Sequence, residues 1–110
     1  MWNKPSEKDL NRLPELYSSE GVLLMEKGIH MHFFLGGCDW YVAEYDKENQ
    51  NFFGFVILNN DYVMAEWGYF NFIELCELKV QFVEVDRDIH FTQAKAKCID
   101  NIRKAESEVT

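Results

Sequence analysis

Between residues 29 and 70, apolar segments of strand length alternate with short polar turns, and this succession constrains the fold more than any other feature of the chain. Segments joined in this way predict an antiparallel meander. The segment from Phe52 to Leu58 is apolar on both faces, which predicts a central strand covered on each side. From Ile29 to Leu35 the pattern alternates, with His30 and His32 on the face opposite the apolar residues. Further strands are predicted from Trp40 to Asp46 and from Tyr62 to Phe70.

Helix signals precede and follow these strands. Leucines recur at helical spacing before Tyr17, which predicts a short N-terminal helix. Asn71 and Glu74 have the spacing of a helix cap, which predicts a short helix near residues 71–79. A weak alternation over residues 80–85 and a strand over residues 88–91 are predicted next. Thr92 is then expected to cap a C-terminal helix with the apolar stripe Ala94, Cys98, Ile99, Ile102 and Ala105.

These elements predict an α+β fold. We expect a mostly antiparallel sheet of four to six strands, with a short N-terminal helix, a short helix near residues 71–79 and a C-terminal helix packed on the sheet. The chain has 110 residues, 47% of them hydrophobic and 15% aromatic, as in one folded domain rather than a disordered segment. A polar lead-in is expected over residues 1–9, a single α+β domain over residues 10–106 and a frayed tail over residues 107–110.

Cysteine usage and hydropathy bear on the compartment. Cys38, Cys76 and Cys98 are widely spaced and odd in number, which disfavours a disulfide framework and favours a reducing compartment. The first residues carry no basic region followed by an apolar run, and no segment approaches the roughly 18 apolar residues of a membrane helix. We therefore expect a cytoplasmic protein with no membrane partner.

The chain is acidic. Its 19 aspartate and glutamate residues and 11 lysine and arginine residues give a formal net charge of −8. A surface of this sign repels the phosphate backbone, so direct binding of nucleic acid is not expected. It suits a protein partner with a basic surface, such as a nucleic-acid-binding protein whose groove it occupies. Solubility alone is the other explanation for the charge.

Glu44 and Asp46 form the strongest local cluster of carboxylates. They are two residues apart on one predicted strand, so both carboxylates are expected on one face, about 7 Å apart. Trp40 and Val42 are predicted to share that face. Paired carboxylates can hold a divalent metal or divide acid and base roles between them. The pair also fits an exposed acidic strand end.

His30 and His32 share a face of their own predicted strand. A His-x-His pair on a strand can supply two ligands to zinc, iron or manganese. Glu44 or Asp46 would complete such a site if the neighbouring strand had the right register. The other interpretation is a pair of histidines on the solvated side of an amphipathic strand.

Two further clusters are candidates for contact with a partner. Arg87 lies between Asp86 and Asp88, which suits an ion pair, a planar fork onto a carboxylate, or a structural network. Residues 66–70 combine one acid with aromatic side chains, which are favoured anchors when exposed and core residues when buried. The candidate partner-binding residues are Glu44, Asp46, Glu66, Trp67, Tyr69, Asp86, Arg87 and Asp88.

Several of these strings occur together in a recognisable order. They are Leu13-Pro14-x-Leu16-Tyr17, Phe33-Phe34, Trp40-Tyr41-x-x-Glu44-x-Asp46, Phe52-Phe53-Gly54, Glu66-x-Gly68-Tyr69-Phe70, Glu74-Leu75 and Asp86-Arg87-Asp88-x-x-Phe91. Over residues 10–92 the ordered set resembles a small bacterial family of unknown function whose members are carried by phages, plasmids and integrative elements. The resemblance implies an accessory role, such as countering a host defence or supporting the maintenance of the element.

The principal hypothesis is a protein-binding module that inhibits a host defence or nucleic-acid-processing enzyme through an acidic, aromatic surface. No cofactor is expected, and enzymatic activity is the less favoured interpretation. One alternative is a small metal-dependent hydrolase or metal-binding protein that uses His30, His32, Glu44 and Asp46. A second alternative is a structural or regulatory subunit of a larger assembly.

Overall fold

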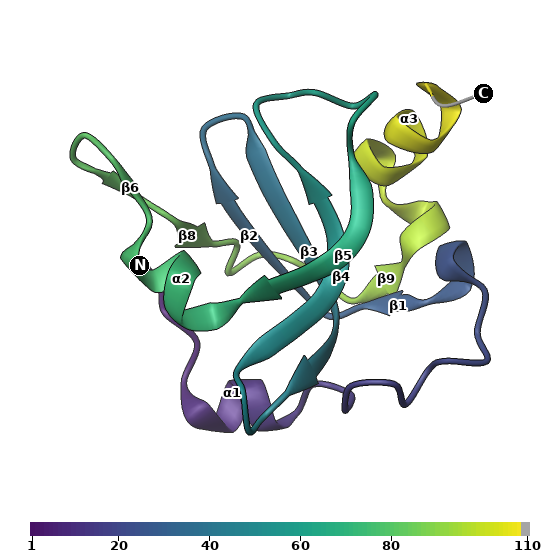
Figure 1. The fold of residues 1–110 in the computed structure, drawn as a ribbon, viewed down its shortest axis with the longest axis horizontal. Coiled ribbons are helices and arrows are strands. Elements are labelled where there is room, and N and C mark those ends of the chain that lie inside the picture. The colour runs from purple at the N-terminus through teal and green to yellow at the C-terminus, as the bar shows by residue number, and fades with distance from the viewer. Residues whose placement is uncertain (109–110) are drawn as a thin grey trace.

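A five-stranded antiparallel sheet forms the centre of the protein, in a computed structural model that describes residues 1–108 (Figure 1). The strand order is β5-β4-β3-β2-β8, so β5 and β8 are the edges. The α+β class and the antiparallel sheet are confirmed. The strands are β2 (Met31–Leu35), β3 (Cys38–Asp46), β4 (Asn51–Ile57), β5 (Glu66–Asn71) and β8 (Asp86–Arg87).

Short elements surround this sheet. β1 (Gly28–Ile29) pairs with β9 (Ala94–Lys95), and β6 (Lys79–Val80) pairs with β7 (Val83–Glu84) in a separate hairpin. The helices are α1 (Glu7–Asn11), α2 (Phe72–Glu77) and α3 (Asp100–Glu108), with 3-10 turns η1 (Leu24–Glu26) and η2 (Ala96–Cys98). Among the described residues no helix is long and apolar enough to cross a membrane.

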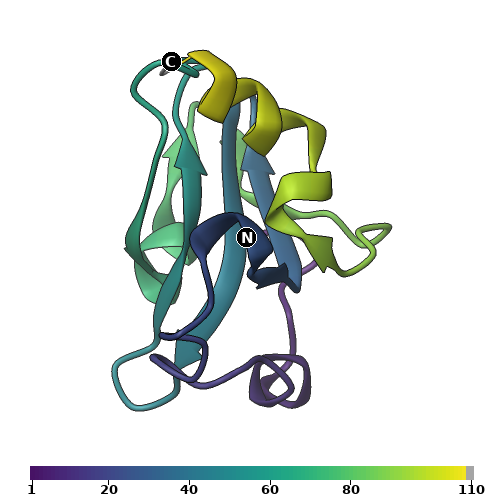
Figure 2. The same cartoon turned by 90° about the vertical axis from the view of Figure 1, so that its right-hand side faces the viewer.

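Each face of the sheet is covered by its own apolar cluster. On the first face, Phe33 and Phe52 pack with Leu10 of α1 and with residues of α2. On the second face, Phe55 packs with residues of η2 and α3, which lie in front of the sheet in Figure 2. Phe52 and Phe55 are fully buried in different clusters, so the prediction that this segment is a central strand covered on both sides is confirmed.

A β-bulge in β3 changes which side chains share a face. The register against β4 shifts between Val42 and Glu44, so Ala43 is the extra residue. Gly54 lies opposite, where an added Cβ would stand 1.8 Å from the Tyr41 carbonyl oxygen. Before the bulge Val42 packs in the first cluster, and after it Tyr45 does. The expectation that Glu44 and Asp46 share the face of Trp40 and Val42 is therefore wrong.

The C-terminal part of the chain also departs from expectation. Residues 88–93 form turns and loop rather than a strand, and Thr92 caps no helix. The last helix begins at Asp100, after the short strand β9 and the turn η2. Of the predicted stripe, Ile102 and Ala105 are buried but Cys98 is exposed. The apolar spacing misled because Ala94 belongs to the short strand β9, which pairs with β1, and the 3-10 turn η2 places Ala96 in the second cluster, so no continuous helix is formed.

The predicted cap of α2 is present, and the N-terminal residues are more structured than expected. Asn71 accepts a hydrogen bond from the Glu74 amide, which confirms the predicted cap. Residues 1–9, expected as a lead-in, contain the first residues of α1, whose cap is Ser6, and a backbone bridge from Trp2 to Asp86. The expected tail begins inside α3, and residues 109–110 lie outside the described part of the chain.

Candidate partner-binding site

Five of the eight residues proposed for partner binding lie at the two edges of the sheet. Glu66, Trp67 and Tyr69 lie on β5, at one edge, whereas Asp86 and Arg87 form β8, at the other. Three strands separate these two groups. The predicted residues therefore do not form a single acidic and aromatic surface.

The β8 edge is covered by the protein's own N-terminal segment. Trp2 donates its amide to the Val85 carbonyl at 2.8 Å and accepts from the Arg87 amide at 3.2 Å. The Arg87 Nε donates to the Asn3 carbonyl at 2.9 Å, and Asn3 Nδ2 donates to Asp86 Oδ1 at 2.8 Å. The Asp86–Arg87 pair therefore holds the N-terminal segment in place and has few groups left for a partner.

Asp88 belongs to a polar cluster around His32 on the second face of the sheet. His32 Nε2 lies 2.8 Å from Asp39 Oδ1, and its Nδ1 lies 3.3 Å from Asp88 Oδ2. The imidazole stacks on the Tyr41 ring at 4.4 Å between centroids. Burial raises the pKa of Tyr41 to about 12, against the opposing hydrogen bond from Asn101. The cluster ties β2, β3 and the loop after β8 together.

The four residues of the hypothetical metal site are not gathered by the fold. Burial has the largest influence on His30 and lowers its pKa, and the Gln93 side chain acts in the opposite direction. Glu44 and Asp46 each bind backbone amides of turns or loops instead of approaching the histidines. Among the described residues, no group of three or more His, Cys, Asp or Glu side chains is placed to hold a metal ion.

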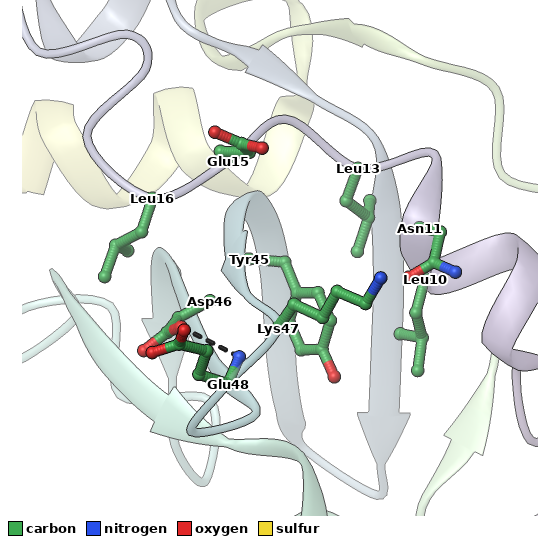
Figure 3. Close-up of a pocket in the computed structure, with 9 residues that line it drawn as sticks. All are labelled: Leu10, Asn11, Leu13, Glu15, Leu16, Tyr45, Asp46, Lys47 and Glu48. Carbon is green, nitrogen blue, oxygen red and sulfur yellow. Dashed lines mark hydrogen bonds between the residues drawn. The ribbon is translucent and has the colours of Figure 1, made fainter.

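Asp46 stabilises the turn between β3 and β4. Its carboxylate accepts from the Glu48 amide at 3.1 Å and from the Asn49 side chain at 2.9 Å. Figure 3 shows the hydrogen bond from the Glu48 amide to Asp46. It lies beside a cavity of about 530 Å³ between the turn and the segment that includes the end of α1 and the residues after it. Glu15 and Lys47 also line the cavity. The hydrogen bonds of Asp46 within the turn give it a structural role there.

The β5 edge is open, in contrast to β8. Phe72 donates its amide to the Gln50 carbonyl at 2.9 Å, and hydrogen-bonded pairs alternate along an antiparallel ladder. It follows that the backbone groups of Gly68 face β4, whereas those of Trp67 and Tyr69 face away from the sheet. Within residues 1–108 no backbone hydrogen bond joins residues 66–70 to a segment on that outer side.

A buried ion pair lies behind this open edge. Glu44, Phe53 and Tyr69 are direct neighbours across β3, β4 and β5. The Glu44 carboxylate lies 3.5 Å from Lys27 Nζ, and both side chains are almost fully buried. The Lys27 ammonium also stands 5.8 Å from the centre of the Phe53 ring. This arrangement exists only because the bulge turns Glu44 toward the second face.

Hydrogen bonds from the loop satisfy the buried carboxylate of Glu44. Its carboxylate accepts from the Tyr17 amide at 2.8 Å, from the Ser19 amide at 3.2 Å and from the Ser19 hydroxyl. Burial raises the pKa of Glu44, but these hydrogen bonds and the Lys27 charge outweigh it and hold the pKa below its usual value. Glu44 therefore remains ionised and anchors the loop of residues 17–27 to the sheet.

The anchored loop forms a cavity of about 400 Å³ next to β5. Tyr17 and Tyr69 both line this cavity and are 60% and 58% exposed, and the Tyr17 side chain is the largest cause that raises the pKa of Tyr69. Leu23, 78% exposed, lines the cavity together with Glu20. We call this surface, made of Tyr17, Glu20, Val22, Leu23, Leu24 and Tyr69, the tyrosine surface.

Residues 17–27 were missed at the level of sequence, although one signal was present. Lys27 is the only lysine or arginine between Arg12 and Lys47, and it stands among apolar residues. A lone cation in such a segment needs a buried acid as its partner. Glu44 was identified for a different reason, as half of a pair with Asp46.

The fold and these contacts define a small α+β domain with one covered and one open sheet edge. It belongs to a protein family of unknown function, DUF2958, whose family model matches residues 29–108. The expected resemblance to a family of unknown function is thus confirmed. The match begins at residue 29, so it leaves out residues 10–28 of the expected range and includes the C-terminal helix instead. Neither a curated protein nor a solved structure matches the chain.

Proposed function

We propose that this protein is a protein-binding module that captures a basic segment of its partner at the tyrosine surface and the adjacent β5 edge. The observation that carries the proposal is the pair of mostly exposed tyrosines, Tyr17 and Tyr69, that line the same cavity. Tyrosines bury a large area with little loss of side-chain entropy, and they are frequent anchors of interfaces. Exposed Leu23 supplies an apolar neighbour for such an anchor.

The charge around the tyrosines favours a cationic partner. Tyr17 is the largest cause that raises the pKa of Tyr69, and the charges of Glu44 and Glu20 add smaller contributions in the same direction. Lys27, the basic residue that lines the cavity, is already paired with Glu44. A lysine or arginine of the partner would meet a negative field here, and could also stack on the tyrosine rings. The net charge of −8 would speed the encounter.

The wider role in this proposal is that of an accessory protein of a mobile element in the cytoplasm. Its partner would be a host defence or nucleic-acid-processing enzyme, because such enzymes present basic grooves. Three unpaired cysteines suit a reducing compartment. Inhibition would follow from occupation of the groove and would require no catalytic residue in this chain.

The test is a comparative capture experiment with the full chain from nuclease-treated lysate of its source cells. The variants are Tyr69→Ala, Glu66→Lys combined with Glu20→Lys, and Phe82→Ala. Phe82 is the matched control, because it is an aromatic residue 95% exposed at the tip of the β6–β7 hairpin, away from the tyrosine surface. One protein is expected to be recovered with the native chain and with Phe82→Ala, and lost with the other two variants.

Binding affinity for the recovered protein is then measured at increasing salt. We expect Tyr69→Ala to weaken binding by about tenfold or more, as for an interface anchor. Charge reversal should both weaken binding and flatten its dependence on salt. Retention of affinity in both variants, or its loss only in Phe82→Ala, would refute the tyrosine surface as the site.

A further inference from the structure

We propose that the partner binds as an extended segment that adds a sixth strand to the sheet along β5. This inference rests on the proposed function and specifies its mode of recognition. In strand addition, the backbone hydrogen bonds of the sheet edge supply affinity, and cavities for alternate side chains supply specificity. The β5 edge has both the free backbone groups and the cavities.

The free backbone groups come from Trp67 and Tyr69. Their amides and carbonyls face away from β4, and no backbone hydrogen bond within residues 1–108 satisfies them. Between them Gly68 has no side chain, and the space where its Cβ would stand is open. An extended segment can therefore form hydrogen-bonded pairs opposite Trp67 and Tyr69.

A cavity lies on each face of the sheet beside this edge. On the second face is the cavity of about 400 Å³ at the tyrosine surface. On the first face, a cavity of about 380 Å³ is lined by Gly68, Leu58 and the 73% exposed Met64. Tyr69 borders both cavities. Because side chains of a strand alternate between faces, an added strand would direct successive residues into the two cavities in turn.

Charge selects a basic segment over a second copy of this chain. Asp61 and Glu66 line the first-face cavity, and Glu20 lines the second-face cavity. Two copies joined through β5 would bring these acids together at one interface, and like charges across an interface disfavour association. A segment with lysine or arginine among apolar residues has the complementary charge, so we assign the edge to such a segment.

Amide exchange measured by NMR tests the free edge first. With the full chain alone, the amides of Trp67 and Tyr69 are expected to exchange fast, and those of Gly68 and Phe70 slowly. The probe is then a peptide selected from a random-sequence library on the immobilised full chain. On binding, exchange at Trp67 and Tyr69 should slow by about tenfold or more, while the amides of the distant β6–β7 hairpin remain unchanged.

Single N-methylation along the same peptide gives the decisive pattern. A methyl group on a peptide amide that faces β5 removes a hydrogen bond and should weaken binding about tenfold or more. A methyl group on the next amide of the peptide should have little effect.

The outcomes separate the mode of binding from the proposed function. If binding needs Tyr69, but the amides of Trp67 and Tyr69 are not protected and affinity does not alternate with the position of the methyl group, strand addition is wrong and the proposed function stands. If binding does not need Tyr69, the proposed function fails as well. If the two amides become protected without peptide as protein concentration rises, a second copy occupies the edge and the proposal is overturned.

Discussion

The two edges of the central sheet differ in how their outward backbone groups are satisfied. At the β8 edge, the backbone groups of Arg87 and of Val85, the residue before β8, hydrogen-bond to Trp2 of the N-terminal segment. On β5, the corresponding groups of Trp67 and Tyr69 have no such partner among residues 1–108. Proteins usually cover or disrupt sheet edges, because an open edge invites pairing with other chains. A chain that covers one edge with its own backbone and leaves the other open has an edge available for a partner.

This comparison assigns different roles to charged clusters that look alike in the sequence. The Asp86–Arg87 pair at the covered edge makes hydrogen bonds within the protein, to Asn3. At the open edge Glu66 is exposed, and no ion pair with it is found within the described residues. The buried acid near that edge, Glu44, instead anchors the loop that carries Tyr17. The following substitutions test this division between the edges.

The largest effect is expected from loss of the ion pair behind the open edge. Glu44→Ala leaves the buried Lys27 ammonium without its partner and removes acceptors for the Tyr17 and Ser19 amides. Breaking a buried pair from one side typically costs about 3–5 kcal/mol, and we expect a loss of this size in the free energy of unfolding by urea. The control is the double variant Glu44→Leu with Lys27→Met, which should recover a large part of the loss. Equal instability of the single and double variants would contradict a dominant role for the charge pair.

The same carboxylate should make stability depend on pH in the acid range. The pKa of Glu44 is held below its usual value of 4.5, so the folded state binds its proton less readily than the unfolded state does. The stabilisation is therefore complete above about pH 4.5 and is lost as the pH falls through the lower folded-state pKa. Urea unfolding of Glu44→Gln should show a shallower decline below pH 4.5 than the native chain. An unchanged slope would show that other carboxylates govern acid unfolding.

Local patterns explain which parts of the fold could be predicted. The alternation that faces Met31, Phe33 and Leu35 inward, and the cap at Asn71, depend on neighbouring residues and were read correctly. The bulge at Ala43 depends on Gly54 of another strand, and it reverses the face of Glu44. No local alternation contains that information.

The site was harder to predict than the fold for the same physical reason. Strand order decides which edge is covered, and the cover on β8 comes from Trp2, more than eighty positions away in the sequence. Lys27 and Glu44 meet only after the loop folds over the bulged strand. Exposed Tyr69 and partly buried Trp67 are also indistinguishable in a run of aromatic residues until the sheet has formed.

A smaller effect separates the two edges by role. Arg87→Gln removes contacts to the Asn3 carbonyl and to Asp9, both partly exposed, and should lower the free energy of unfolding by about 1 kcal/mol. Glu66→Gln at the open edge should change it by less than about 0.5 kcal/mol. Affinity for the partner should respond in the opposite order: Glu66→Gln should bind more weakly than the native chain, and Arg87→Gln should bind as tightly as the native chain. Loss of affinity in Arg87→Gln at full stability would move the binding site to β8.

The smallest effect concerns the paired tyrosines at the open edge. The Tyr17 side chain is the largest cause that raises the pKa of Tyr69, with smaller contributions from burial and from the charges of Glu44 and Glu20. Tyr17→Phe should therefore lower the pKa of Tyr69 toward its ordinary value, as measured by NMR of the tyrosine ring carbons during alkaline titration. Glu20→Gln should lower it by a smaller amount, because its charge is the last of these causes. A pKa of Tyr69 that does not respond to Tyr17→Phe would mean that the two rings are separate in solution, and the tyrosine surface would then lack the paired anchor on which its proposed role depends.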